Sequence, residues 1–355
     1  MHANHLITIL KNMKDFNFPS IKTILKIALP IVLLILMAIF FSALTKGRKI
    51  SGPHTRSGFF FDTIIEISIY DSLTNEDSEK ILSECLSLCE KYENLFSKTI
   101  SGSDVYRINH ESTIPVKVDS ETISLVEYAV NTARLSSGLV DPTVGSLTSL
   151  WNIASDDFSL PSDPEISQAL SCVDYRQITI DSEKQTITLG NPDAAIDLGF
   201  VAKGYIADRL RDYLESRDVK SALINLGGNI LTLGNKPDGR DFKIGIKNPK
   251  DPGGAPITSV CVKGKSVVSS GAYERNVTID GITYHHILST KNGYPAESDL
   301  SGVTIISENS IDGDALSTLL FILGKDEAEK FLNKNYPDIQ AILITVDSDI
   351  IFVNR

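Results

Sequence analysis

At 355 residues and 42% hydrophobic composition, the chain can bury one large core or two moderate ones, which excludes a disordered chain. A net charge of −11 argues against a nucleic-acid partner, because phosphate contacts require a basic surface. An anionic ligand therefore has to be held by local devices, such as a helix N-terminus or a metal ion.

One long apolar run, ILKIALPIVLLILMAIFFSAL, extends from Ile24 to Leu44, and no charge follows Lys26 within it. This length suits a single membrane-spanning helix. A cleaved signal peptide is the alternative, but the run is long for one and no A-x-A site follows it. We therefore expect a cytoplasmic segment at 1–23, a transmembrane anchor at 24–45, a polar linker at 46–57 and a globular extracytoplasmic domain at 58–355.

The first half of this domain predicts one strand and three helices. The segment FFFDTIIEISIY (59–70) is rich in Phe, Ile and Thr and partly alternates, which predicts a strand. Helical periodicity predicts a helix over Asn75–Phe96 with Thr74 as its N-cap. A second helix is expected from Glu121 to Ser136, capped by Ser120 and stopped by Gly138. A third should follow Asp197.

The second half is dominated by short strands separated by Gly, Pro and Asp turns. The expected strands are SALINL, NILTLG, FKIGIK, SVCVKG, SVVSSG and GVTIIS. Helices are expected at 312–323 and 326–334, and AILITVDSDIIFVN reads as a terminal hairpin. Together these elements predict an α+β domain of about 300 residues, with mixed sheets and flanking helices.

The stretch SIDGDALSTLLFILG (310–324) places Asp312 and Asp314 just ahead of an apolar helical run. Asp314 and Thr318 are four residues apart, so their oxygens share one helical face. Such oxygens can cap the helix start or bind an ion, and this stretch alone favours capping.

Three further stretches combine Gly, a carboxylate and a second polar group. They are GLVDPTVGSLTSLW (138–151), AIDLGFVAKGYIADRL (195–210) and SSGAYERNVTIDGITYHHILSTKNGYP (269–295). Each also has an ordinary structural explanation, since Asp-Pro and glycine form turns and Lys203 could be solvated. Of the adjacent His285 and His286, only one can face a given site if they lie on a strand.

In this order, the motifs SGLVDPTVGSLTSLW, IDLGFVAKGYIAD, INLGGNI, SSGAYER followed by YHHI, and DALSTLLFILG resemble the FAD:protein FMN transferases, the ApbE family. The resemblance extends from about Phe59 to Gly324. It implies an ApbE-like fold and the transfer of FMN from FAD to a Thr or Ser hydroxyl of a partner protein, with release of AMP. The partner implied is an extracytoplasmic redox protein that carries a flavinylation motif, and the anchor would hold the enzyme beside it at the cell membrane.

The resemblance also implies an Mg²⁺ site made by Asp314, Thr318 and the main-chain carbonyl of Phe200. The resemblance therefore favours ion binding over helix capping as the main role of the 310–324 stretch, and it leaves capping as a second role for Asp312. An acidic protein needs a cation beside a diphosphate, and Mg²⁺ prefers oxygen ligands.

By the same resemblance, FAD, the substrate, is expected to contact eight residues at four places in the chain. The contacts are Phe61, Asp62, Leu139, Val140, Asp141, Asp197, Lys203 and Ile287. His286 is the candidate base for the acceptor hydroxyl, with Asp314 as the alternative. The chain departs from the family pattern at Phe61-Asp62, where Met-Gly is common, at Phe200, and at Leu288-Ser289-Thr290 after the histidines.

Two other functions remain open at this stage. With water as the acceptor, the same site would be an FAD pyrophosphatase that yields FMN and AMP. A flavin-binding module without chemistry is the other alternative, although it would need no metal. A serine hydrolase has little support, since no G-x-S-x-G motif is present.

Overall fold

The computed structural model describes residue 26 and residues 28–38, 49–111, 113–153, 155 and 158–354, which fall into two units. In the first unit (Met1–Ile50 and Leu73–Asp77), residues 28–38 are helical and their large apolar side chains are exposed. The rest of the predicted anchor at 24–45, and all of 1–23, lie outside the described residues. Within the described part of the chain, every helix is too short or too polar to cross a bilayer.

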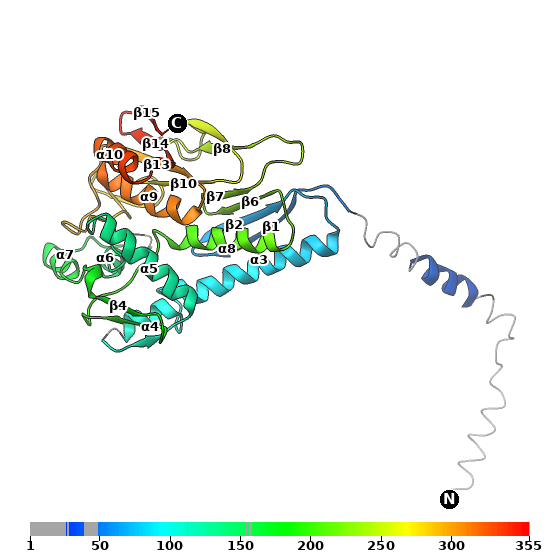
Figure 1. Cartoon of the computed structure of the whole chain (residues 1–355), viewed down its shortest axis with the longest axis horizontal. Coiled ribbons are helices and arrows are strands. Elements are labelled where there is room, and N and C mark those ends of the chain that lie inside the picture. Colours follow the sequence, from blue (N-terminus) through cyan, green and yellow to red (C-terminus); the bar gives the residue numbers. More distant parts are fainter. Residues whose placement is uncertain are drawn as a thin grey trace, which may run out of the picture. The chain divides into compact units, whose positions relative to one another are not determined.

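An eight-stranded sheet forms the centre of the second unit, with its strands in the order β1-β2-β6-β7-β10-β13-β14-β15 (Figure 1). Neighbouring strands in this sheet are antiparallel, rather than mixed as predicted. The reason is that tight turns join several neighbours, and such turns connect only antiparallel strands. The strands are β1 (His54–Phe60), β2 (Thr63–Ile69), β6 (Ala222–Leu226), β7 (Asn229–Leu233), β10 (Ser266–Gly271), β13 (Leu300–Ser307), β14 (Gln340–Thr345) and β15 (Ile350–Val353).

The segment 59–70, predicted as one strand, is a hairpin. Phe61 and Asp62 both adopt positive φ, at 54° and 55°, and turn the chain back between β1 and β2. The prediction of a continuous strand is wrong because neither residue is the glycine that normally signals such a turn. β1 begins at His54, so the last residues of the predicted linker at 46–57 belong to the sheet.

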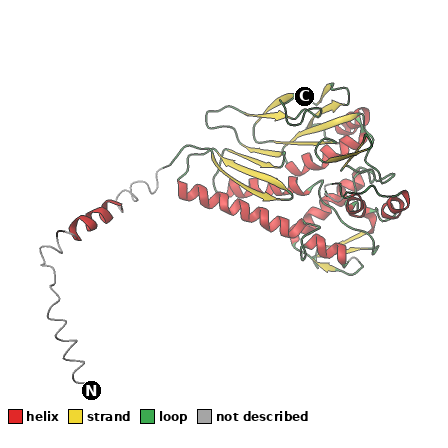
Figure 2. Cartoon of the chain, turned by 180° about the vertical axis from the view of Figure 1, so that it is seen from behind, coloured by secondary structure: helices red, strands yellow, loops and turns green. Residues whose placement is uncertain are grey.

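Three helices cover one face of the sheet (Figures 1 and 2). Helix α8 (Ala202–Ser216) packs on β6 and β7, and α9 (Ser310–Leu323) packs on β10, β13 and α8. The long helix α3 (Asn75–Phe96) has its predicted bounds and lies beside β1 and β2. α10 (Lys325–Asn335) follows α9 and contacts it.

The opposite face is covered by the predicted strands β8 (Phe242–Ile246) and β9 (Thr258–Val262), which pair as a hairpin. Their side chains form a cluster with Val267 and Ile306 of the large sheet. The next residue of β10, Val268, faces the other way and lies against Gly313 of α9. Successive residues of β10 therefore serve opposite faces of the sheet.

Shorter elements surround this sheet. Helix α5 starts one residue before its prediction and is capped by Asp119 rather than Ser120, since the Asp119 carboxylate accepts the Glu121 N–H at 2.8 Å. The elements are α4 (Asp104–His110), α5 (Ser120–Leu135), α6 (Gly145–Trp151), α7 (Asp163–Leu170), η1 (Tyr175–Gln177), the sheet of β3 (Val116–Lys117), β5 (Thr186–Leu189) and β4 (Ile178–Asp181), and the hairpin of β11 (Asn276–Ile279) and β12 (Ile282–His285).

Candidate active site

Helices α8 and α9 meet in direct backbone contact, and this contact positions Asp314. A Cβ atom on Gly204 would lie 2.4 Å from the Ser310 carbonyl oxygen, so only glycine permits the approach. The Gly204 N–H donates to Oδ2 of Asp314 at 2.9 Å, and Asp314 is 5% exposed. Its carboxylate is therefore held at the N-terminal end of α8, where the N–H groups of the first turn favour negative charge.

The same hydrogen bond affects the carbonyl of Phe200. In a regular helix the Gly204 N–H would donate to the residue four positions earlier, which is Phe200. Asp314 accepts this N–H instead, whereas the next amide, that of Tyr205, donates to Val201 in the regular way. The Phe200 carbonyl, in the turn that leads into α8, therefore does not accept the Gly204 N–H.

Thr318 lies one helical turn beyond Asp314 on α9, is half-buried, and has its Oγ1 3.4 Å from the Ser270 hydroxyl. Among the described residues, no group of three or more His, Cys, Asp or Glu side chains could hold a metal. The predicted ligands, one carboxylate, one hydroxyl and one carbonyl, suit Mg²⁺, which takes few protein ligands and completes its shell with water and phosphate. They do not suit zinc, which prefers nitrogen and sulfur.

The start of α9 is capped by a side chain of α8. Asp208 accepts hydrogen bonds from the N–H groups of Ser310 and Ile311 at 2.9 and 3.0 Å. Asp312, predicted to have a capping role, instead accepts the Tyr128 hydroxyl at 2.6 Å. That prediction is wrong because α9 begins at Ser310, which puts Asp312 inside the first turn. A carboxylate on each helix therefore binds the N-terminal end of the other.

Asp197 precedes α8 and is paired with Lys98, a residue that the sequence pattern does not reveal. Its Oδ2 accepts from Lys98 Nζ at 2.8 Å and from the Thr148 hydroxyl at 2.7 Å, and its Oδ1 accepts from the Gly199 N–H at 2.9 Å. Burial raises the pKa of this carboxyl, but the Lys98 charge and the hydrogen bonds outweigh burial and lower the pKa to about 2. Asp197 is therefore ionised, and the ammonium group of Lys98 neutralises its charge.

Lys203 lies in the first turn of α8, with its Nζ 3.4 Å from the Gly199 carbonyl. Desolvation raises the pKa of the nearby Glu274 carboxyl; the charges of Lys203 and Lys247 oppose this effect, and Asp314 adds to it. Two carboxylates and two lysines are therefore within electrostatic reach of one another. Glu274 stands in the singled-out stretch SSGAYER, yet nothing in the sequence links it to Asp314.

The two adjacent histidines face different surroundings. His285 is buried and its Nε2 lies 3.2 Å from the Ala296 carbonyl. His286 has Nδ1 3.3 Å from the Arg275 carbonyl. Burial, together with the charges of Arg275 and Lys203, lowers the pKa of His286 to about 4, although the hydrogen bond to the carbonyl acts in the other direction. The next residue, Ile287, is 4% exposed and belongs to the core.

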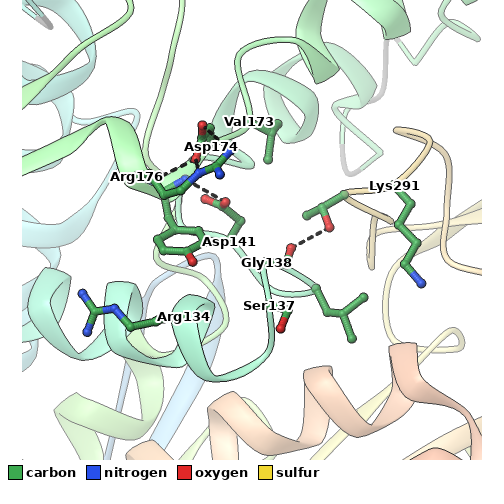
Figure 3. A pocket seen from close by; sticks show the side chains of 11 residues that line it. Arg134, Ser137, Gly138, Asp141, Val173, Asp174, Arg176 and Lys291 are labelled. Atoms are coloured by element: carbon green, nitrogen blue, oxygen red, sulfur yellow. Dashed lines mark hydrogen bonds and ion pairs between the residues drawn. The ribbon is translucent and has the colours of Figure 1, made fainter.

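The 139–141 segment, expected to contact FAD, faces two ways. Leu139 and Asp141 line a pocket of about 400 Å³ together with Arg134, Arg176 and Lys291, and Figure 3 shows Asp141 and Lys291 on different sides of it. Val140 is 4% exposed and packs in the core with the side chains of α9.

The Asp141 carboxylate is engaged within its own loop. It accepts the N–H and hydroxyl of Thr143 at 2.8 and 2.6 Å and the Tyr175 N–H at 2.8 Å. Burial raises the pKa of this carboxyl, while these hydrogen bonds act to lower it. Asp141 therefore shapes the pocket wall by joining two loops.

Phe61 and Asp62, the predicted flavin contacts of the β1–β2 turn, lie at the same end of the sheet as the Gly227-Gly228 turn of the β6–β7 hairpin. The reason is the register, in which Ile65 of β2 pairs with Leu226 of β6. The Phe61 N–H donates to the Glu93 carboxylate at 2.6 Å, which fixes the turn against α3.

We expect Asp197→Asn to destabilise the protein at neutral pH, because the charge–charge contact with Lys98 is lost. The folded pKa of about 2 lies below the ordinary value of 3.8, so this stabilisation is present above that ordinary value and disappears as the pH falls through the folded one. Urea unfolding should therefore give a difference between wild type and variant that shrinks from about pH 5 to pH 2. Asp193→Asn, at an exposed position, is the control. A difference that is independent of pH would contradict the ion-pair assignment.

Comparisons with known proteins identify the family of this chain. The model of the ApbE family matches residues 61–343. An FAD:protein FMN transferase of Klebsiella pneumoniae is 38% identical over 77% of this chain and 84% of its own, and one of Treponema pallidum is 32% identical over 85% and 87%. The crystal structure of an ApbE protein from Thermotoga maritima superposes with a TM-score of 0.78 at 32% identity, covering 84% of this chain and 96% of that one. The chain therefore belongs to the ApbE family.

Proposed function

We propose that this chain is an FAD:protein FMN transferase that moves FMN from FAD to a Thr or Ser hydroxyl of an acceptor protein and releases AMP. The relatives from Klebsiella pneumoniae and Treponema pallidum carry this name. The observation that carries the proposal is the oxygen site at the α8–α9 contact, where Gly204 holds the Asp314 carboxylate at 2.9 Å. This site lies beside Lys203, so cations are available for a diphosphate in an otherwise acidic protein.

Asp314, Thr318 and the Phe200 carbonyl would hold Mg²⁺. The ion would supply neutralisation of the charge on the phosphate oxygens, which is the main requirement of phosphoryl transfer. The protein would hold its ligand oxygens in place before the ion binds. For the Asp314 carboxylate, the backbone N–H of Gly204 does this without a flexible side chain.

In the reaction, the acceptor oxygen bonds to the phosphorus of the FMN half while the bond from this phosphorus to the bridging oxygen breaks. AMP leaves with the bridging oxygen, and the acceptor proton passes to a base. His286 suits this role: its Nδ1 faces the Arg275 carbonyl, which only accepts, so Nε2 carries the free lone pair. With a pKa near 4, the imidazole is neutral at physiological pH. Asp314 is the alternative base.

We propose protein contacts for both the diphosphate and the flavin ring of FAD. Lys203 provides a charge for the diphosphate, and Asp197 shapes the turn before α8. Phe61 and Asp62 are proposed to contact the flavin, and the 139–141 segment to line the FAD pocket. The buried side chains of Val140 and Ile287 would contribute through the backbone and the packing behind it.

Residues 24–45 are proposed to anchor the enzyme in the cell membrane with the catalytic domain (58–355) outside the cytoplasm. The support is the apolar run of the sequence, which carries no charge after Lys26. Anchoring would raise the effective concentration of the enzyme near a membrane-associated redox acceptor.

This anchor is tested with the full chain and a form that starts at Ser51, each incubated with an acceptor embedded in the same membrane vesicles. At equal and low enzyme concentration, the full chain should flavinylate this acceptor faster, whereas a soluble acceptor domain should be modified equally by both. Equal rates on the embedded acceptor would argue against the anchoring role.

The transfer itself is tested with the full chain, FAD, Mg²⁺ and a protein that bears a flavinylation motif. We expect an acceptor band with flavin fluorescence on a denaturing gel, because a phosphoester survives denaturation. The band should be absent with EDTA and with Asp314→Ala, which removes a charged oxygen from the metal site.

The products distinguish the alternatives. Free FMN and AMP without a labelled band would identify a pyrophosphatase. Intact FAD that remains bound to the protein would identify a binding module. Either result would refute protein flavinylation by this chain.

Replacing His286 by Gln should lower kcat by about 10²–10⁴-fold, the usual contribution of a positioned base, with a smaller effect on the KM for FAD. The base acts when neutral, so wild-type kcat/KM should fall as the pH drops through about 4 and be level above this region. His110→Gln, an exposed histidine stacked on Tyr106, is the control. If His286→Gln keeps the kcat of the wild type, His286 is not the base, and Asp314 becomes the candidate.

A further inference from the structure

A chain of hydroxyl groups connects the middle strand β10 to the predicted metal ligand Thr318. The Ser270 Oγ lies 2.8 Å from the Ser317 Oγ and 3.4 Å from the Thr318 Oγ1. The Ser317 hydroxyl in turn donates to the main-chain carbonyl of Asp314 at 3.0 Å. The chain thus begins at one proposed metal ligand and ends on the backbone of the other.

The direction of each hydrogen bond follows from counting protons. A hydroxyl has one proton to donate, whereas a carbonyl has none. The Ser317 proton is used on the Asp314 carbonyl, so Ser270 has to donate to Ser317. The Ser270 proton is then used as well, so the contact with Thr318 requires the Thr318 proton to point toward Ser270.

We infer that Ser270 is a positioning residue that turns the Thr318 hydroxyl so that its lone pairs face the cation. This inference rests on the metal site of the proposed function. A neutral hydroxyl can ligate a cation only through its oxygen lone pairs, and a proton aimed at the ion would repel it. Groups behind the ligands commonly set ligand orientation in this way, and losing one typically costs 10–100-fold in metal affinity.

Burial supports a fixed direction for these bonds. Ser317 is 0% exposed and Ser270 is part-buried, so water competes little for the protons. Gly313, in the turn of α9 before Asp314, lets the helix approach β10 closely, since a Cβ there would lie 2.8 Å from the Val268 side chain.

The alternation of β10 provides a matched control. Ser269 precedes Ser270 and faces the opposite side of the sheet, where its hydroxyl lies 2.8 Å from that of Thr304. Ser269→Ala removes the same atoms from the same strand at a comparable hydrogen bond, without touching the chain to Thr318.

The test is a Mn²⁺ titration of the full chain with FAD bound and no acceptor, followed by electron paramagnetic resonance. We expect Ser270→Ala to raise the Kd for Mn²⁺ about tenfold and Ser269→Ala to leave it unchanged. Ser317→Ala should also raise the Kd, because Ser270 no longer has an acceptor there and can donate to Thr318 instead, which turns the Thr318 proton toward the ion. In flavin transfer, Ser270→Ala should need more Mg²⁺ for half-maximal rate while keeping the rate at saturating Mg²⁺.

The outcomes separate this inference from the proposed function. If wild type binds Mn²⁺ and Asp314→Ala does not, the metal site stands, and an unchanged Kd in both Ser270→Ala and Ser317→Ala would overturn the positioning role. If wild type and Asp314→Ala bind Mn²⁺ equally, the metal site itself is refuted, and the inference falls with it. Equal losses in Ser270→Ala and Ser269→Ala would also overturn the inference, since a general effect on β10 would then explain both.

Discussion

The hydrogen bond from the Gly204 N–H to the Asp314 carboxylate is the contact on which the site depends. It joins two residues that are 110 positions apart in the chain, and it forms only because Gly204 has no side chain. Through this one bond, the packing of α8 against α9 places a buried carboxylate in the first turn of α8, next to Lys203 in the chain. Fold stability and site geometry are therefore linked at the same atoms.

Charge balance around the site is achieved pair by pair rather than by the net charge of the protein. Asp197 is neutralised by Lys98, and Asp208 is held by two N–H groups of α9 and by Arg211. Asp314 is the buried carboxylate at this junction that has one hydrogen-bonded N–H and no salt bridge among the described residues. A buried carboxylate without a salt bridge is expected where a bound cation would balance its charge.

Much of the fold could be predicted from local patterns. Helical periodicity gives α3 and α9 to within two residues, and the strand pattern gives β6, β7, β10 and the terminal hairpin. The predictions failed where a distant residue decides a local structure. The cap of α9 comes from Asp208 on another helix, and the partner of Asp197 comes from the loop after α3. The break between β1 and β2 was missed because two non-glycine residues adopt positive φ.

The candidate site shows the same limit. Motif order predicts the metal ligands and singles out the histidine pair, because these residues carry recognisable chemistry. Ser270 lies in a motif that the sequence singles out and Lys98 does not, but the partners of both side chains are set by tertiary packing. Ser270 meets Ser317 where β10 packs on α9, and Lys98 meets Thr148 through the α3–α4 loop. Burial of Val140 and Ile287 likewise follows from tertiary packing rather than from any local signal.

The hairpin of β11 and β12 sets which of the two adjacent imidazoles is buried in the core. Its two-residue turn, Asp280-Gly281, fixes a register in which His285 pairs with Asn276, and His286 follows on the other face. In a strand, a shift of one residue exchanges the two faces. One residue more in this surface turn would therefore exchange the faces of His285 and of the proposed base, His286. The length of a surface turn therefore determines which of the two histidines is available as the proposed base.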